Sequence, residues 1–297
     1  MAGIAVLIAA GIAAGGYYYL RERSAEARIT MTAQEDEPEA APATEPPAAP
    51  PSNPLLVAVP MAANATRPKK DKPAEDAGLP IRAGEVLEYS ANVSNLTNVA
   101  NLRVVVGVRR DYFGKSAWHL QAFAHTENPL RYVFALDDQF DSYSDAGSMA
   151  SLQYEMHLDE RGQKVNSVQR MTTTAKEPAT PNVTEARVLP GTRDPLGMLE
   201  YLRHVDWTKT AEVRCPVYDG RKLYDVRAKV GSEGEAVTVP AGSFKTTKIE
   251  LRVFEDGQEM KDAQFTIFIA NNTARTPVLL EAVMPVATAR VELTRSN

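Results

Sequence analysis

The sequence contains one cysteine, Cys215, in 297 residues. A single cysteine excludes an internal disulfide and a cysteine-based zinc cluster. Its context, R-C-P-V, is typical of a residue packed within a strand, so we do not expect it to act as a nucleophile. The scarcity of cysteine therefore removes disulfide-linked and zinc-stabilised folds from consideration.

The chain also lacks a strong excess of charge of either sign. It has 33 basic and 38 acidic residues, a net charge of -5, and no basic stripe interleaved with aromatic residues. Affinity for nucleic acid depends on basic surfaces, because contacts to phosphate supply much of the binding energy. We therefore expect no nucleic-acid partner.

Motifs of the common catalytic and cofactor sites are missing as well. There is no G-x-S-x-G elbow, no H-E-x-x-H and no G-x-x-x-x-G-K phosphate loop. Ser148, Ser232 and Ser243 each follow a glycine but lack the flanking residues of a nucleophile elbow. The sequence thus predicts no catalytic residue, no cofactor and no metal ligand, and we expect the protein not to be an enzyme.

The four histidines are the remaining candidates for a metal site. His119 and His125 would share one face of a strand, but their separation of six residues corresponds to about 20 Å. His157 and His204 are isolated in the sequence. We expect all four to be surface or packed histidines.

The most distinctive feature present is an apolar run of 19 residues, Ala2 to Leu20. As a helix it would rise roughly 28 Å, close to the thickness of the hydrocarbon core of a bilayer. Three tyrosines, Tyr17 to Tyr19, lie near the end of the run, and Arg21 and Arg23 follow it directly. Aromatic and basic residues in this arrangement are typical of a membrane interface. We predict that residues 1–28 form an N-terminal membrane helix that acts as a signal-anchor, with a cleaved signal peptide as the alternative.

The basic residues near this run all follow it, and the positive-inside tendency would keep that side in the cytoplasm. We nevertheless expect export, since this tendency can yield when a long domain follows. Residues 2–20 would then hold the protein in a membrane of a bacterial cell envelope. The rest of the chain would lie in the periplasm, or would be secreted if the N-terminus is cleaved.

Residues 29–80 are rich in Pro, Ala and Glu, a composition that cannot bury enough apolar surface to order the chain. We predict a disordered linker, which would span about 40 Å as a flexible coil and about 160 Å in polyproline geometry. An apolar patch at Leu55–Val59 and a basic cluster at Arg67–Lys72 are expected to be incidental features of this linker.

Residues 81–297 have the pattern of one β domain. Alternating apolar residues predict half-buried strands around Leu102–Val108, Ile249–Val253, Phe265–Ile269 and Ala287–Leu293. Turn pairs at Arg161-Gly162, Asp219-Gly220 and Asp256-Gly257 indicate short antiparallel connections. We expect an all-β fold, a curved antiparallel sheet or partial barrel of about a dozen strands, with a two-sheet sandwich as the alternative.

Two stretches break the β pattern. D-P-L-G-M-L-E-Y-L-R-H-V has helical spacing, with Asp194 as the N-cap and Pro195 in the first turn, and predicts the one main helix. D-D-Q-F-D-S-Y-S-D-A-G is predicted to form a helical turn closed by Gly147. The sheet is expected to wrap around the main helix or to be capped by it.

A family resemblance is carried by ordered motifs along this domain. They are D-D-Q-F-D-S-Y-S-D, then D-P-L-G-M-L-E-Y-L-R, then Y-D-G-R-K-L-Y-D-V, then V-P-A-G-S-F, and a closing strand pair. From roughly Gly84 to Thr294 the chain resembles the bacterial family DUF3108. The resemblance implies an exported envelope protein with a curved antiparallel sheet, similar to the folds of periplasmic lipoprotein carriers. It brings no established catalytic residues.

The motifs themselves have structural explanations. In P-A-G-S-F, Pro240 and Gly242 would form a tight turn and Phe244 would fill the end of the core. The acidic block holds Asp137, Asp138, Asp141 and Asp145. Counted from Asp141, it fails the EF-hand pattern at the third, sixth and twelfth positions, which are Tyr143, Ala146 and Leu152. We therefore expect a solvated turn instead of a calcium site.

These observations favour a non-catalytic envelope protein whose membrane-tethered β domain binds a lipid, another amphiphile or a partner protein in its curved sheet. A structural scaffold without a ligand is one alternative. An envelope enzyme that acts on glycans is another, and it would need paired carboxylates such as Asp138 with Glu155 or Glu160. The sequence leaves the oligomeric state open.

Overall fold

The computed structural model describes residues 80–173, 182–285 and 287–297. The expected membrane helix and linker, residues 1–28 and 29–80, lie outside the described residues apart from Pro80. Within the part of the chain that is described, no helix is long and apolar enough to cross a membrane.

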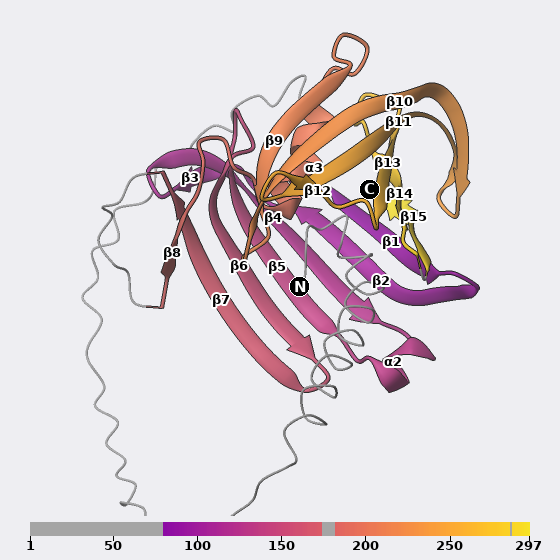
Figure 1. Cartoon of the computed structure of the whole chain (residues 1–297), viewed down its shortest axis with the longest axis horizontal. Helices are drawn as coiled ribbons and strands as arrows, with labels where there is room; N and C mark the ends of the chain where they lie inside the picture. The colour runs from indigo at the N-terminus through magenta and orange to yellow at the C-terminus, as the bar shows by residue number, and fades with distance from the viewer. Residues whose placement is uncertain (1–79, 174–181, 286) are drawn as a thin grey trace, which may run out of the picture. The chain divides into compact units, whose positions relative to one another are not determined.

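The described residues form one sheet of fifteen strands and two helices (Figure 1). The strands are β1 (Val86–Val93), β2 (Leu96–Val106), β3 (Arg110–Tyr112), β4 (Lys115–Thr126), β5 (Asp137–Asp145), β6 (Ser151–Glu160), β7 (Gln163–Thr172), β8 (Thr184–Arg187), β9 (Glu212–Tyr218), β10 (Leu223–Val239), β11 (Gly242–Glu255), β12 (Gln258–Glu259), β13 (Gln264–Ala270), β14 (Pro277–Val283) and β15 (Thr288–Ser296). The helices are α2 (Leu130–Val133) and α3 (Pro195–His204).

The strands follow the order β8-β7-β6-β5-β4-β2-β1-β15-β14-β13-β11-β10-β9, while β3 pairs with β4 and β12 with β11. Neighbouring strands are antiparallel except β7 and β8, which are parallel. The predicted all-β curved sheet is confirmed, with three short strands beyond the expected dozen. The sandwich alternative is wrong, because one hydrogen-bonded path runs through thirteen of the strands and the other two, β3 and β12, pair with strands of that path.

Bulges explain why the sheet stays continuous while it curves. The long pair β10 and β11 shifts register twice, between Val230 and Ser232 and between Glu233 and Glu235. Each bulge leaves an extra residue in β10 and increases the local twist, so the pair bends without breaking. Figure 1 shows this pair arching over the other strands.

The predicted turns are present. Arg161-Gly162 and Asp256-Gly257 both have positive φ at both residues and close the hairpins β6–β7 and β11–β12. P-A-G-S-F connects β10 to β11, with Val239 paired to Gly242 across the turn. Phe244 is partly buried against the core, as predicted.

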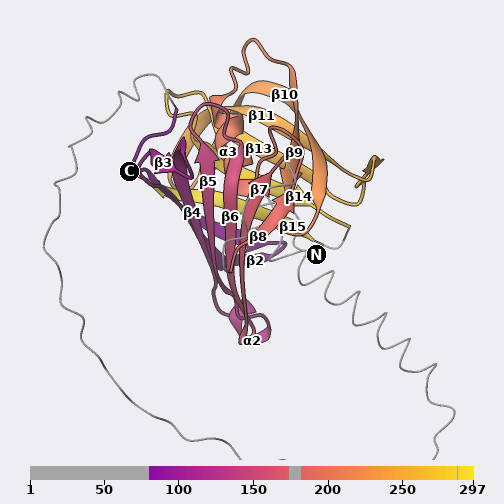
Figure 2. The ribbon, with the colours of Figure 1, turned by 90° about the vertical axis from the view of Figure 1, so that its left-hand side faces the viewer.

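Helix α3 matches the predicted helix, and Asp194 caps it by accepting hydrogen bonds from the backbone N–H groups of Leu196 and Gly197, both at 2.9 Å. Eight of its ten residues are buried. The helix therefore lies within the curve of the sheet (Figure 2), and its Leu196, Met198 and Leu202 join the hydrophobic core.

The predicted helical turn in D-D-Q-F-D-S-Y-S-D-A-G is wrong: Asp137–Asp145 is strand β5, and Gly147 lies in the turn that follows it. The block alternates between the two faces of the sheet. Ser142 and Ser144 point toward α3, and the Ser142 hydroxyl donates to the carboxylate of Asp194. The prediction failed because Phe140 is the one apolar residue among the inward-facing side chains of β5, so the strand carries no apolar alternation.

Candidate functional site

Strands β4 to β7 present two chemically different faces. The cross-strand register pairs Ala122 with Phe140, Phe140 with Met156, and Leu158 with Val165, so these side chains share one face. That face is the one toward α3, because Ser142 of the same strand face bonds to the helix cap. We call it the inner strip: Ala122, Ala124, Asp138, Phe140, Met156, Leu158 and Val165.

The inner strip is apolar and partly accessible. Phe140 and Leu158 are half-buried, and Val165 is 49% exposed. Toward α3 the apolar strip gives way to the buried hydroxyls of Ser142 and Ser144. Contiguous accessible apolar patches mark interaction sites, and the register places these side chains on adjacent strands of one face, so the strip is a candidate binding surface.

The β9–β10 turn covers another part of this face. Gln169 of β7 donates a 2.7 Å hydrogen bond to the carbonyl of Gly220 in that turn. Gly220 has a φ of +95°, and a Cβ there would come within 2.4 Å of the Met156 Cε. A glycine is therefore required at this close approach.

Asp138 is the acidic residue of the inner strip. It is 6% exposed, and its Oδ1 accepts a 2.9 Å hydrogen bond from the backbone N–H of Asp159. Burial raises its pKa to about 7, and the negative charge of Glu160 adds to this effect. The strip therefore holds a carboxyl group that changes charge near neutral pH.

This raised pKa predicts an unusual dependence of stability on pH. Between about pH 4 and pH 7 the folded state keeps a proton on Asp138 that the unfolded chain has lost, so the free energy of unfolding falls as the pH rises. We expect a fall on the order of 2 kcal/mol between about pH 5 and pH 8 in urea titrations. Asp138→Asn should reduce this fall and should stabilise the protein at pH 8.

Two comparisons make this prediction specific. Asp141→Asn should leave the slope between pH 5 and pH 8 unchanged, because the pKa of Asp141 is lowered and its titration lies below this window. Glu200, whose pKa burial also raises to about 7, should supply the slope that persists in Asp138→Asn. If the free energy of unfolding of Asp138→Asn fell with pH as steeply as that of the wild type, Asp138 would not be the source of the pH dependence.

The opposite, outer face of these strands is polar and centres on Asp141. Its Oδ1 lies 2.7 Å from the Nε2 of His119 and accepts a 2.8 Å hydrogen bond from Gln121, while its Oδ2 accepts a 2.7 Å bond from Gln139. Burial alone would raise the pKa of Asp141, but these hydrogen bonds hold it below its usual value. Asp141 is therefore an ionised group with its acceptor positions occupied.

Aromatic side chains flank this polar centre. The ring of Tyr143 stacks on that of His119, with centroids 4.7 Å apart, and Tyr112 and Phe113 of the β3–β4 hairpin pack against Tyr143. The guanidinium of Arg170 lies 3.7 Å from the centroid of Phe113. Such stacked and cation–π contacts hold the hairpin over the outer face.

Of the two predicted carboxylate pairs, Asp138 with Glu155 or with Glu160, the structure places only the second on one face. Asp138 faces the inner strip and Glu155 the outer face, so these two cannot act on one bond. Asp138 and Glu160 share a face, since Leu136 bridges Glu160 across the strands. The residue directly opposite Glu155 is Asp141, a pair that the sequence did not predict.

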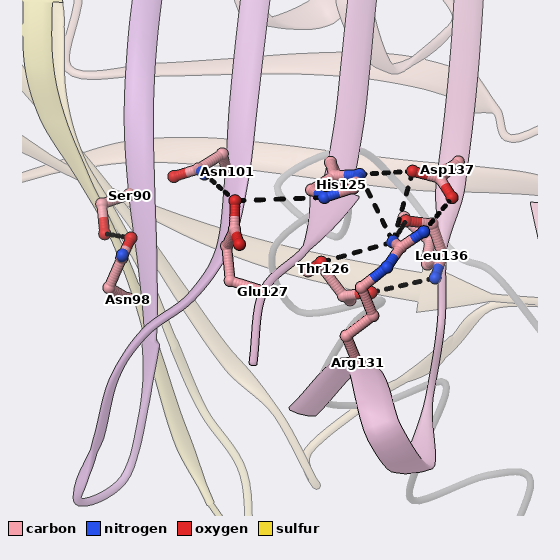
Figure 3. Close-up of polar contacts among 9 residues, drawn as sticks. All are labelled: Ser90, Asn98, Asn101, His125, Thr126, Glu127, Arg131, Leu136 and Asp137. Carbon is pink, nitrogen blue, oxygen red and sulfur yellow. Dashed lines mark hydrogen bonds and ion pairs between the residues drawn. The ribbon is translucent and has the colours of Figure 1, made fainter. Parts of the chain in front are cut away.

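The three histidines of strands β4 and β6 all lie on the outer face beside a carboxylate. His119 pairs with Asp141, His125 with Asp137 (Figure 3), and His157 lies 3.6 Å from Glu155. His204 bonds instead to the backbone carbonyl of Glu200 in α3. Among the described residues, no group of three or more His, Cys, Asp or Glu side chains is arranged to hold a metal ion.

Two further predicted residues have structural roles. Cys215 is buried in β9, as predicted, and burial raises the pKa of its thiol to about 11. Asp145 accepts hydrogen bonds from the backbone N–H groups of Gly147 and Ser148, so it organises the turn after β5.

With this geometry in place, comparison with protein families gives a clear match. The model of the family described as DUF3108, protein of unknown function, matches residues 88–294. The chain belongs to the DUF3108 family. This confirms the resemblance inferred from the ordered motifs. No curated protein matches the chain.

Solved structures with similar folds are distant in sequence. A β-barrel-like DUF1849 protein from Brucella abortus is 10% identical, with a TM-score of 0.45, over 72% of this chain and 97% of its own. A presumed lipoprotein from Parabacteroides distasonis is 11% identical, with a TM-score of 0.34, over 73% and 96%. A presumed exported protein with a YmcC-like fold from Bacteroides fragilis is 10% identical, with a TM-score of 0.28, over 74% and 98%.

The DUF3108 domain also contains a buried ion cluster that sequence reasoning missed. Arg203 of α3 is fully buried, and its guanidinium bonds to Glu85 and Glu200, both at 2.8 Å. It also donates to the backbone carbonyls of Pro80 and Ala274. The cluster joins the start of the described chain, the helix and the β13–β14 connection.

Proposed function

We propose that this DUF3108 chain is a non-catalytic protein of the bacterial cell envelope. Its N-terminal segment would tether it to a membrane, and its β domain would bind a lipid or similar amphiphile along the inner strip. The proposal combines the apolar run at residues 2–20, the Pro-rich residues that follow it, and the chemistry of the inner strip.

The observation that carries the proposal is the accessible apolar surface on the inner side of β5 to β7. Phe140, Leu158 and Val165 keep exposed surface there, beside a carboxyl group, Asp138, whose pKa is raised to about 7, so that it is about half protonated at neutral pH. Contact with an acyl chain would remove these apolar side chains from water, which is favourable in free energy, and a polar head group could hydrogen-bond to the carboxyl. The outer face differs because its centre, around Asp141, consists of hydrogen-bonded polar groups, and its exposed Phe113 is covered by the guanidinium of Arg170.

The glycan-acting alternative would now use Asp141 and Glu155, which face each other across β5 and β6. Directly opposed carboxylates occur in retaining glycosidases, whose carboxyl groups lie about 5 Å apart. The oxygens of Asp141, however, are already occupied by His119, Gln121 and Gln139. This arrangement suits a structural hydrogen-bond network better than a nucleophile.

Photo-crosslinking from adjacent residues on opposite faces tests the proposal. A benzophenone amino acid at Leu158 in the full chain, within cell envelopes, should give lipid adducts detectable by mass spectrometry. The same amino acid at His157 is the matched control, because successive residues of a strand point to opposite faces. We expect adducts at 158 to exceed those at 157 about tenfold, the ratio expected for roughly 1.4 kcal/mol of preference.

A second variant tests whether the strip acts as one surface. Phe140→Asp places a charge in the middle of the strip and should reduce the adduct formed at 158, whereas Val168→Asp on the outer face should not. Equal adducts at 157 and 158 would refute amphiphile binding on the inner strip. A complete absence of adducts would favour the scaffold alternative.

A further inference from the structure

Exposed apolar side chains gather at one end of the sheet. In the described part of the chain eight large apolar residues are exposed, and five of them lie at the same ends of the strands: Leu96, Tyr132, Val133, Val165 and Val283. These ends carry the β1–β2, β4–β5, β6–β7 and β14–β15 connections, which antiparallel pairing places together. We call this end the apolar rim.

The figures agree with this placement. In Figure 1 the β6–β7 turn, α2 and the β1–β2 turn follow one another along the lower and right edge of the described strands. In Figure 2, α2 lies at the lower end of β4 to β7. The backbone N–H of Glu127 donates to the carbonyl of Val99, and that of Arg161 to Ala135, so neighbouring connections are hydrogen-bonded to one another.

The most exposed pair of the rim is firmly held. Tyr132 and Val133 of α2 are 82% and 70% exposed, because Leu130 and Phe134 of the same segment pack against the core. Arg131 binds the segment to β5 through a 2.7 Å ion pair with Asp137 (Figure 3).

Side-chain and backbone bonds between β4 and β5 brace the same segment. The Thr126 hydroxyl accepts a 2.9 Å bond from the backbone N–H of Leu136, and Thr126 donates its own N–H to the Leu136 carbonyl. A rigid segment with two apolar side chains pointing outward loses little entropy on contact with a partner.

The chain enters the domain at the other end of the sheet. The backbone N–H of Gly84, just before β1, donates to the carbonyl of Val106, the last residue of β2. The apolar rim is therefore at the opposite end of β1 from the entry of the N-terminal segment. The predicted linker, residues 29–80, would reach about 160 Å in polyproline geometry, which would allow the rim to face a membrane surface.

We propose that the apolar rim inserts shallowly into a lipid bilayer. Its apolar residues come from four separate connections. A bilayer can accept each of these side chains without a matching pocket. Tyrosine is enriched at membrane interfaces, and Tyr132 is the most exposed apolar residue of the rim. Val165 belongs to both the rim and the inner strip, so an amphiphile could pass directly from the bilayer to the strip.

Spin-label accessibility on the full chain tests this contact. A label at Tyr132→Cys should gain collisions with oxygen and lose collisions with a water-soluble nickel complex when the protein meets vesicles of phosphatidylethanolamine and phosphatidylglycerol. Leu189→Cys is the matched control, since Leu189 is 56% exposed and lies away from the rim. Cys215 is buried and its thiol pKa is raised, so it should not take up the label.

A second pair of variants tests whether the rim acts as a unit. With the label at Leu96→Cys, the changes Tyr132→Ser and Val133→Ser together should weaken the vesicle-dependent protection by at least about tenfold, as expected for removing two apolar side chains that a shallow insertion covers only in part. Val108→Ser with Leu189→Ser, at exposed positions outside the rim, should leave the protection unchanged.

Two results would overturn the proposal. Unchanged access at 132 in the presence of vesicles would exclude lipid contact, and a loss of access at 132 that depends on protein concentration without vesicles would assign the rim to a second copy of the chain. The spin label at position 132 reports on the rim, whereas the crosslink at position 158 reports on the inner strip. Failure of bilayer insertion is therefore distinguishable from failure of amphiphile binding.

Discussion

Replacing Arg203 with methionine is expected to lower the free energy of unfolding by about 3–5 kcal/mol, since it leaves two buried carboxylates without their counter-ion. Arg203 is fully buried, and Glu85 and Glu200 are 5% and 1% exposed. One oxygen of each carboxylate already has no hydrogen-bond partner among the described residues. The guanidinium is therefore the group that makes their burial tolerable.

Equilibrium unfolding in urea, followed by the fluorescence of the buried Trp118 and Trp207, measures this loss. Arg203→Lys keeps the positive charge but loses the planar set of guanidinium donors. Its free energy of unfolding should therefore lie between those of the wild type and Arg203→Met. Combining Arg203→Met with Glu85→Gln and Glu200→Gln should recover part of the lost stability, because no buried charge is then left unpaired. A loss below about 1 kcal/mol in Arg203→Met would show that water reaches the cluster.

The sequence could not reveal this cluster, for a geometrical reason. Glu85 and Arg203 are separated by 118 residues. Glu200 and Arg203 stand among the apolar residues of a predicted helix, and charges on an amphipathic helix usually lie on its solvated side. Because the curved sheet surrounds α3, this side of the helix is buried as well.

Period-two alternation, in contrast, was sufficient to predict the strands of the core. In β2 the predicted residues Leu102, Val104 and Val106 are buried, but Val108, predicted on the same face, lies beyond the end of the strand and is 44% exposed. In β11 the predicted face of Ile249, Leu251 and Val253 is buried. Alternation is a local signal that reports burial of one face, and the turn pairs then fix the antiparallel order. The overall fold class therefore followed from local patterns.

The acidic block at β5 shows where local patterns are ambiguous. Asp137, Asp141 and Asp145 recur every four residues, which places them on one side of a helix but equally on one face of a strand. The deciding information is what the intervening residues contact. Ser142 and Ser144 face the cap of α3, a contact with a segment about 50 residues further along the chain.

The carboxylate pairs illustrate the limit of prediction for the site. Whether Asp138 or Asp141 shares a face with Glu155 depends on the register of β5 with β6, and one residue of slippage exchanges the two faces. The turn between these strands is followed by a register shift between Tyr143 and Ser144. Turn length alone therefore could not have given the register.

The second large effect is expected at Asp194, where one side chain joins three elements. Its Oδ1 caps α3, and its Oδ2 accepts hydrogen bonds from the hydroxyls of Ser142 in β5 and Ser151 in β6. Asp194→Ala would remove the cap and leave two buried hydroxyls without their acceptor. We expect the free energy of unfolding to fall by about 2–4 kcal/mol, measured in urea.

Asp194→Asn separates the two contributions, because its amide keeps one oxygen to cap the helix and can donate from its nitrogen to the serine hydroxyls. It should cost about half as much as Asp194→Ala or less. The double change Ser142→Ala with Ser151→Ala removes the hydroxyls instead, and adding Asp194→Ala to it should then cost about 1 kcal/mol, the value of a lone N-cap. If Asp194→Ala cost the same in both backgrounds, the serines would not be coupled to the cap.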